Sequence, residues 1–171
     1  TCHVTCHVTC HVTCHVTCHV TCHVKRKVTG QVKCVRCCDG AGVTGVILPK
    51  HRAVHVTPTV AKTSAGAIEH VPMTLVPGLP VAITQMRDKG IWVVGLDDSS
   101  ENTLFDIANF ATDGICIVLG SEGTGLSRLV KERCDTVVSI PMLGQVSSLN
   151  VSAAAALATY EVTRARLASP A

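Results

Sequence analysis

The chain has 171 residues, a length that suits one domain with a substantial core. Hydrophobic residues make up 47% of it and aromatic residues only 2%, so the core must be built from Val, Ile, Leu and Ala. A formal net charge of +3 permits a nucleic-acid partner but is too small to indicate a dedicated nucleic-acid binder. We find no apolar run of membrane-spanning length and expect no secretory signal.

Eleven cysteines raise the question of disulfides or bound metal. Six of them lie in residues 1–24, and the other five are Cys34, Cys37, Cys38, Cys116 and Cys134. Cys116 lies inside an apolar run, where a reduced and buried thiol is the ordinary interpretation. The odd count and the lack of a secretory signal favour a reducing, cytoplasmic setting.

Residues 1–24 repeat the tetrapeptide Thr-Cys-His-Val six times without a change. In an extended chain this period puts Cys and Val on one face and Thr and His on the other, so the pattern favours a strand over a helix. A metal-binding tract is chemically possible, but successive Cys and His ligands would point to opposite faces. A tag-like segment is a second interpretation. We favour a third, that the repeat stands in for other residues, and we derive no function from it.

After residue 24, strand and helix signals alternate along the chain. In chain order, apolar β-rich runs predict strands at 43–48, 72–76, 91–96, 115–119 and 136–140. Helical spacing and end signals predict helices at 57–69, 80–89, 126–132 and 149–166, with a short helix or turn at 102–110. This alternation predicts one α/β domain, residues 25–171, whose parallel sheet is flanked by helices on both faces.

Several ends of these elements carry recognisable residues. Gly90 stops the helix at 80–89, Pro141 ends the last strand, and Ser147 or Ser148 caps the final helix. In α/β sheets of this kind, ligands bind beyond the carboxyl ends of the strands. The loops after residues 96, 119 and 140 are therefore the places where we expect a site.

A glycine-rich loop, Gly120-Ser-Glu-Gly-Thr-Gly125, follows a buried strand and precedes a helix. Glycines there let the backbone approach a ligand closely, and a helix start offers amide donors. The loop lacks the Gly-Lys-Ser/Thr of a P-loop and the spacing of a dinucleotide-binding fingerprint. Taken alone, it indicates a tight turn at least as much as a binding site.

Two further stretches follow in a specific order. Ser139-Ile-Pro-Met142 closes a strand on proline, and Ser147-Ser-Leu-Asn-Val-Ser152 opens an Ala-rich helix, where a plain N-cap is the simplest interpretation. Together with the glycine loop, this order resembles the SpoU (TrmH-like) branch of the SPOUT methyltransferases. The closest likeness is to the RlmB group, which modifies a guanosine of large-subunit ribosomal RNA; the stretch 61–72 also resembles that group. The resemblance covers roughly residues 34–167.

The resemblance implies a carboxyl-terminal trefoil knot, a homodimer, and S-adenosyl-L-methionine held within the knot. It implies cofactor contacts, largely through backbone groups, at Gly120, Ile140 and Leu149, with Leu96 and Met142 in the surrounding wall. The family's polar active-site positions correspond to Glu122, Ser148 and Asn150, and its catalytic arginine corresponds to Arg36.

The family's first motif is present only in part. It usually reads Asp-Pro-x-Asn-x-Gly, then an Arg and a small-residue helix that ends in Gly. Residues 35–42 match its end, although Arg36 could also be a solvated surface residue. Gly30 and Val32 stand where the motif has Asn and Gly, Lys27-Val28 stands in place of Asp-Pro, and the first strand falls within the repeat. Either the chain has lost this motif, or residues 1 to about 35 do not report the real sequence; we favour the second interpretation.

The resemblance implies that the chain transfers a methyl group from S-adenosyl-L-methionine to a ribose 2'-oxygen of RNA. The expected substrate is a guanosine of 23S ribosomal RNA. The alternatives are a tRNA ribose 2'-O-methyltransferase and a non-catalytic RNA-binding protein of the same fold, which the incomplete first motif would suit. Arginine is almost always protonated, so Arg36 acts either as a base assisted by its surroundings or as a stabiliser of the developing oxyanion. We expect no metal site, because His51, His55 and His70 are too scattered to form a ligand set.

Overall fold

The computed structural model describes residues 18–22, 28–50, 67–121, 124–146 and 148–168. Within them, six strands form one sheet in the order β3-β2-β1-β5-β4-β6, and all pairings are parallel. The strands are β1 (Cys18–Cys22), β2 (Gly45–Pro49), β3 (Met73–Val76), β4 (Trp92–Leu96), β5 (Ile115–Leu119) and β6 (Thr136–Val138).

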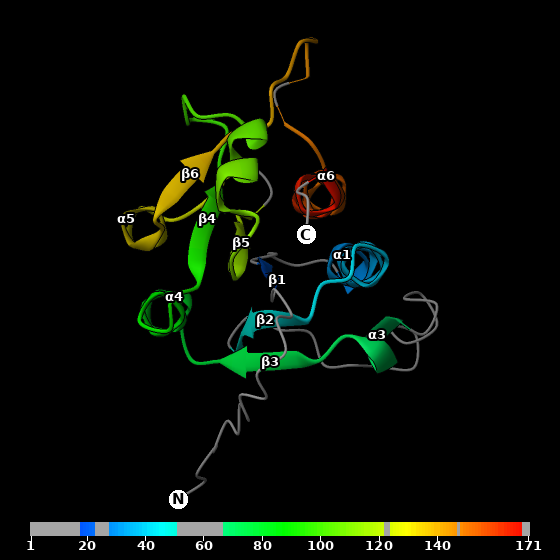
Figure 1. The fold of residues 1–171 in the computed structure, drawn as a ribbon, viewed down its shortest axis with the longest axis vertical. Coiled ribbons are helices and arrows are strands. Elements are labelled where there is room, and N and C mark those ends of the chain that lie inside the picture. The colour runs from blue at the N-terminus through cyan, green and yellow to red at the C-terminus, as the bar shows by residue number, and fades with distance from the viewer. Residues whose placement is uncertain (1–17, 23–27, 51–66, 122–123, 147, 169–171) are drawn as a thin grey trace, which may run out of the picture.

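Helices cover both faces of this sheet (Figure 1). On one face, α1 (Val28–Gly40) packs beside α6 (Val151–Ala168), with the 3₁₀ helix η2 (Leu104–Phe110) against α6 and the short α3 (Ala67–His70) against α1. On the other face lie α4 (Leu79–Arg87) and α5 (Arg128–Arg133). The predicted α/β class, a parallel sheet flanked by helices, is confirmed.

Strand β5 shows why its sequence is apolar without interruption. Ile115, Ile117 and Leu119 belong to the core under α1 and α6, whereas Cys116 and Val118 belong to the core under α4 and α5. All five side chains are at most 1% exposed. A strand covered on both faces has no solvent-facing side, so polar alternation is absent. Cys116 is a buried thiol, as predicted.

Strand β1 lies within the Thr-Cys-His-Val repeat and pairs with β2 and β5 near the centre of the sheet. A central strand of a parallel sheet normally carries apolar residues on both faces. The repeat instead alternates Cys and Val with Thr and His. These residue types therefore do not suit the place in the sheet that β1 occupies.

Several predicted boundaries differ from the structure by one or two residues, and two of these differences have a clear physical cause. The last strand ends at Val138 rather than at residue 140, because Ser139 leaves the β4 ladder and bridges to Thr103. The last helix begins at Val151 rather than at 149. Its cap is Asn150, whose Oδ1 accepts a hydrogen bond from the amide of Ser152 at 2.9 Å, rather than Ser148.

The other elements for which a range was predicted lie within a few residues of it, and η2 replaces the predicted short helix or turn. No range was predicted for α1, which we expected only as the helix that ends in Gly in the family's first motif. Gly90 follows α4 with φ of 74°, the left-handed conformation expected of a glycine that stops a helix. Most of the helix predicted at 57–69 lies outside the described residues, and only its end is seen, as part of α3. Ser147, one of the two predicted caps of the last helix, also lies outside them. In the described part of the chain, every helix is too short or too polar to cross a membrane.

The middle of β4 leaves no room for a side chain at Gly95. A Cβ there would lie 2.7 Å from Leu126 Cδ1 and 3.1 Å from Cys134 Sγ. Gly95→Val should therefore lower the free energy of unfolding by about 1–3 kcal/mol through overpacking. Urea unfolding measures this loss, and Gly144→Val is the control, because nothing lies within 4 Å of a Cβ at Gly144. Equal losses at the two positions would contradict the packing argument.

Candidate active site

A pocket of about 690 Å³ opens at the carboxyl ends of β4, β5 and β6. Its wall is formed by the loops that follow these three strands and by the first turn of α6. The volume lies within the range of small-molecule sites. The pocket thus lies at the loops after residues 96, 119 and 140, where the sequence predicted a site.

The structure brings most of the predicted site residues together at this pocket. Those that line it are Leu96, Gly120, Ile140, Met142, Ser148, Leu149 and Asn150. Glu122 lies outside the described residues. Arg36 is described but does not line the pocket; it lies exposed on α1. Four separate stretches of sequence therefore converge, and the predicted arginine stays apart from them.

The glycine loop closes on itself at the rim of the pocket. The amide of Ser121 donates to the carbonyl of Gly125 at 3.0 Å, and the amide of Gly125 donates back to the carbonyl of Ser121 at 2.9 Å. Gly125 has φ of 60°, a left-handed conformation that favours glycine. A Cβ at Gly120 would lie 2.5 Å from the carbonyl carbon of Gly125. Both glycines are therefore required by the tightness of this turn.

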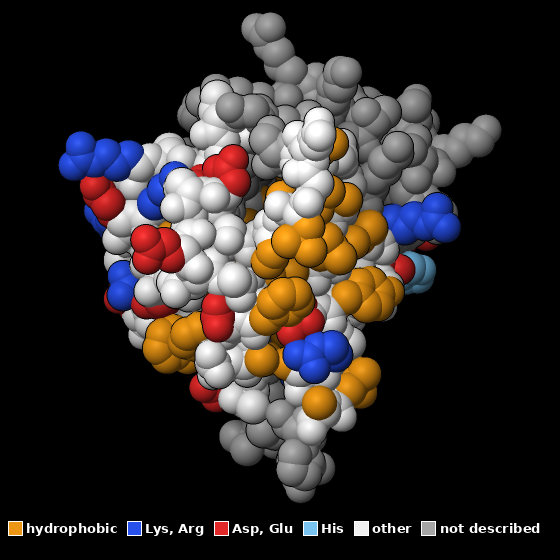
Figure 2. Space-filling view, turned by 90° about the horizontal axis from the view of Figure 1, so that it is seen from above, with side chains coloured by type: hydrophobic (Ala, Val, Ile, Leu, Met, Phe, Trp, Pro, Cys, Tyr) orange, Lys and Arg blue, Asp and Glu red, His pale blue; other side chains and the backbone are white. Residues whose placement is uncertain are grey.

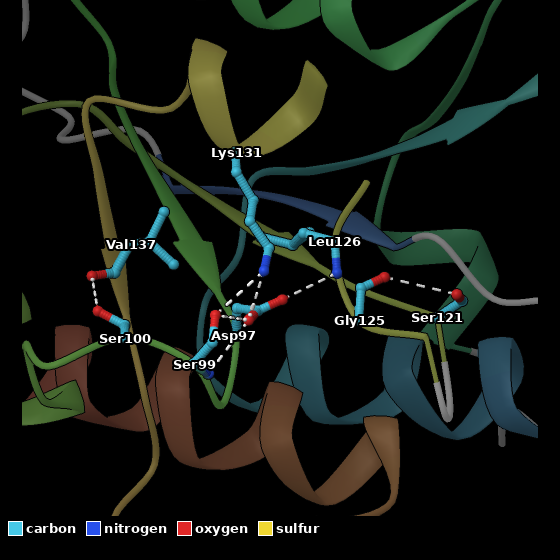
Figure 3. A network of polar contacts seen from close by, with 8 residues as sticks. All are labelled: Asp97, Ser99, Ser100, Ser121, Gly125, Leu126, Lys131 and Val137. Carbon is cyan, nitrogen blue, oxygen red and sulfur yellow. Dashed lines mark hydrogen bonds and ion pairs between the residues drawn. The ribbon is translucent and has the colours of Figure 1, made fainter. Parts of the chain in front are cut away.

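Asp97 is a site residue that the sequence analysis missed. It directly follows β4, is only 7% exposed, and lines the pocket. Its Oδ1 accepts hydrogen bonds from Lys131 Nζ at 2.7 Å and from the Ser99 amide at 3.1 Å, and its Oδ2 accepts one from the Leu126 amide at 3.1 Å (Figure 3). An acidic residue directly after an apolar strand, at the edge where ligands bind, was the available signal.

The charge of Asp97 is stabilised by these contacts. Burial raises the pKa of its carboxyl group, but hydrogen bonds from Lys131, Ser99 and the Leu126 amide together outweigh burial and lower the pKa to about 2. Lys131 and Asp97 also form an ion pair, in which the Lys131 side chain is 34% exposed and the Asp97 side chain 3%. The pocket wall therefore contains an ionised, internally compensated carboxylate at neutral pH.

The loop after β4 is also tied to the end of β6. The amide of Leu104 donates to the carbonyl of Ser139 at 2.7 Å, and the amide of Ser139 donates to the carbonyl of Asn102 at 2.8 Å. Beside them, the Ser100 hydroxyl donates to the carbonyl of Val137 at 2.6 Å (Figure 3). The pocket residues that directly follow Ser139 are thereby held in place by backbone hydrogen bonds.

The pocket lining combines apolar side chains with hydroxyl, amide and charged groups. Among its described residues, Lys131 is the only cation, and Asp97 and Asp98 are the only carboxylates. No set of three His, Cys, Asp or Glu side chains in the described ranges is placed to hold a metal ion. The arrangement can therefore bind an organic ligand that has both apolar and hydrogen-bonding parts.

Acid unfolding should reveal the charge of Asp97. Its pKa of about 2 in the folded protein lies below the value of about 3.9 for an unfolded Asp. The ionised carboxylate therefore stabilises the fold above about pH 4, and this contribution is lost as the pH falls towards 2. We expect wild type to be more stable than Asp97→Asn at pH 5, and the gap in free energy of unfolding to shrink between pH 4 and 2. Denaturant titrations across this range measure the gap, and a gap independent of pH would rule out this role.

Comparison with known proteins identifies relatives. The model of the SpoU rRNA Methylase family matches residues 31–160. A protein of Staphylococcus aureus (strain COL), assigned to the TrmH family of tRNA/rRNA methyltransferases, is 50% identical over 133 residues, which are 77% of this chain and 52% of that protein. A Bacillus subtilis (strain 168) protein with the same assignment is 48% identical over 135 residues, with the same coverage. The chain thus spans about half the length of the curated relatives it matches.

Solved structures share the fold. The SpoU methyltransferase AviRb from Streptomyces viridochromogenes, solved in complex with AdoMet, matches with a TM-score of 0.79 at 27% identity, over 89% of this chain and 61% of that one. An A. aeolicus TrmH/SpoU tRNA modifying enzyme matches in fold, with a TM-score of 0.77 at 23% identity, over 88% of this chain and 75% of that one. Because the family model covers most of the chain and relatives reach 50% identity, the chain belongs to the SpoU rRNA methylase family.

Proposed function

We propose that this chain forms the catalytic domain of an RNA methyltransferase that uses S-adenosyl-L-methionine to methylate a ribose 2'-oxygen. The observation that carries the proposal is the pocket at the carboxyl edge of the sheet, where predicted cofactor-binding residues from separate stretches converge. Membership of the SpoU family supports it. So does the AdoMet complex of AviRb, which has the same fold.

The pocket fits such a ligand in size and in chemistry. Leu96, Ile140 and Met142 offer apolar surface suited to an adenine ring. Backbone groups at the strand ends and in the glycine loop suit the polar edge of the base and the ribose. When bound, S-adenosyl-L-methionine supplies a methyl group that its sulfonium makes electrophilic. The protein's task is then to orient this methyl group towards the RNA and to exclude water.

Residues at the start of α6 are placed to receive the RNA ribose. Ser148 and Asn150 line the pocket and are also exposed to solvent. Asn150 is held by its capping bond to the Ser152 amide. We assign to these two residues the contacts that align the 2'-oxygen with the methyl group. The oxygen would lose its proton to water as it takes the methyl group, and Arg36 would stabilise the charge that develops on it.

Arg36 cannot perform this role in the pocket of its own chain as the structure stands, because it does not line that pocket. We therefore propose a homodimer in which α1 of one chain presents Arg36 to the pocket of the other. The neighbouring α6 supports an interface, since Leu157, Tyr160 and Leu167 are 46%, 51% and 82% exposed. Seen from above, apolar side chains gather near the centre of the visible face (Figure 2).

We also propose that the carboxyl-terminal segment forms the knot of the family. Strand β6 lies at one edge of the sheet, whereas α6 packs against α1. The chain between Ser139 and Asn150 therefore crosses the ends of the strands. The bridge between Ser139 and Thr103 starts this crossing beside the loop after β4, which supports passage of the segment through that loop.

For the substrate we propose a guanosine of 23S ribosomal RNA, because the motifs in residues 115–152 resemble the RlmB group most closely. A tRNA ribose is the alternative, since the curated relatives are assigned to tRNA/rRNA methyltransferases. Incubating the protein with a labelled methyl donor and either 23S ribosomal RNA or bulk tRNA separates the two. Labelling of neither RNA by a protein that binds the cofactor would favour the non-catalytic alternative.

Calorimetric titration with S-adenosylhomocysteine tests the cofactor pocket. We expect wild type to bind one equivalent per chain. Gly120→Ala should bind at least about tenfold more weakly, because its Cβ would force the turn apart 2.5 Å from the Gly125 carbonyl carbon. Gly144→Ala, which adds the same methyl group in open space, should bind like wild type. Failure of wild type to bind would refute the proposed cofactor.

Arg36→Ala should abolish RNA methylation while cofactor binding persists. Mixing this variant with Gly120→Ala then tests whether Arg36 acts across a dimer. At a cofactor concentration too low for Gly120→Ala to bind, random exchange of chains would restore about a quarter of the wild-type sites, because only mixed dimers pair an intact pocket with an intact Arg36. Full methylation by Arg36→Ala would sink its assignment. An inactive mixture, with chain exchange confirmed by mass spectrometry, would contradict action across the dimer.

A further inference from the structure

We infer that Asp97 is a positioning residue for the cofactor pocket, and that its carboxylate fixes the described ends of the glycine loop, residues 120–121 and 124–125, against the end of β4. This inference rests on the proposed function, because the loop is assigned to cofactor binding there. It concerns a residue that lies outside the motifs singled out in the sequence.

The carboxylate joins three parts of the pocket wall. Asp97 itself directly follows β4, Leu126 directly follows the glycine loop, and Lys131 lies on α5 (Figure 3). Oδ2 accepts from the Leu126 amide at 3.1 Å, and Oδ1 accepts from Lys131 Nζ at 2.7 Å. The Ser99 amide and hydroxyl also donate to Oδ1, at 3.1 and 2.5 Å. One side chain thus holds two pocket loops and a helix in a fixed relation.

The glycine loop is shaped around this carboxylate. A Cβ at Gly125 would lie 2.6 Å from Asp97 Oδ2, so the carboxylate packs directly against the Gly125 backbone. The same glycine closes the turn through its paired hydrogen bonds with Ser121. A shift of Asp97 would therefore move Gly125, and through it the backbone at the pocket rim.

The hydrogen bonds also show why Asp97 acts through the loop rather than on a ligand. Both of its oxygens are engaged by donors of the protein, and its side chain is 3% exposed. The carboxylate therefore positions the glycine loop, and the backbone of that loop is the part that contacts a ligand. Lys131, at 34% side-chain exposure, compensates the charge from the wall of the pocket.

An amide cannot replace this carboxylate while Lys131 remains charged. The Asn side chain of Asp97→Asn can take two orientations. If its oxygen accepts from the Leu126 amide, its NH₂ group faces the ammonium of Lys131. The reverse orientation points the NH₂ group at the Leu126 N–H. Removing the ammonium with Lys131→Met relieves part of the first conflict, because the NH₂ group can then donate to the Ser99 hydroxyl, although it still faces the Ser99 amide N–H. The second substitution should therefore partly rescue the first.

The test measures S-adenosylhomocysteine binding by calorimetry and Leu126 amide hydrogen exchange by NMR in the ligand-free protein. Asp97→Asn should raise the Kd at least about tenfold and quicken Leu126 exchange. Asp97→Asn with Lys131→Met should bind more tightly than Asp97→Asn alone. Asp88→Asn is the control, because Asp88 is exposed after α4 and does not line the pocket. Circular dichroism confirms folding at the temperature of measurement.

A Kd for Asp97→Asn that matches Asp88→Asn, or a double variant that binds no better than Asp97→Asn, would overturn the inference. If Asp97→Asn does not fold, two variants of Lys131 replace it. Lys131→Met should weaken S-adenosylhomocysteine binding and quicken Leu126 exchange, whereas Lys131→Arg should preserve both. Equal behaviour of these two variants would overturn the inference. Absence of binding by wild type would refute the proposed function instead, and Leu126 exchange alone would then decide the role of Asp97.

Discussion

Burial of one parallel sheet on both faces is the constraint on which the rest of this structure depends. It makes β5 uniformly apolar and divides its side chains between two cores. Polar chemistry is thereby confined to the ends of the strands. At the carboxyl edge, three loops and the start of α6 enclose a pocket, and a buried carboxylate, a glycine turn and backbone bridges keep the loops together. Binding at this edge is a consequence of how the core is built.

The fold and the place of the site could be predicted because their signals are local. Apolar runs, Gly90 after a helix, and the glycine loop after β5 each lie within a few residues of the feature they specify. The Asp97 network could not be predicted in the same way. Its partners Leu126 and Lys131 lie 29 and 34 residues further along the chain, and only the pairing of β4 with β5 brings them near. The early end of β6 has the same cause, since Ser139 bridges to Thr103.

The amino-terminal part of the chain shows a different limit of sequence reasoning. Period alone favoured a strand in the repeat, and β1 is found there, yet its residue types do not suit the centre of a parallel sheet. Arg36 matches the family's arginine by position in the sequence, but the fold of one chain leaves it away from the pocket. We propose instead that Arg36 reaches the pocket of a partner chain. In this proposal each pocket is formed by one chain, and methyl transfer needs two chains.

The central claim is that this pocket holds the cofactor through the backbone of its three loops. A crystal structure with S-adenosylhomocysteine tests it most directly. Our account predicts the ligand between the glycine loop and the start of α6, with hydrogen bonds to backbone groups around Gly120, Ile140 and Leu149, and with Asp97 still bonded to the Leu126 amide. A ligand bound elsewhere, or held there only by side chains with the glycine loop displaced from Asp97, would contradict the account.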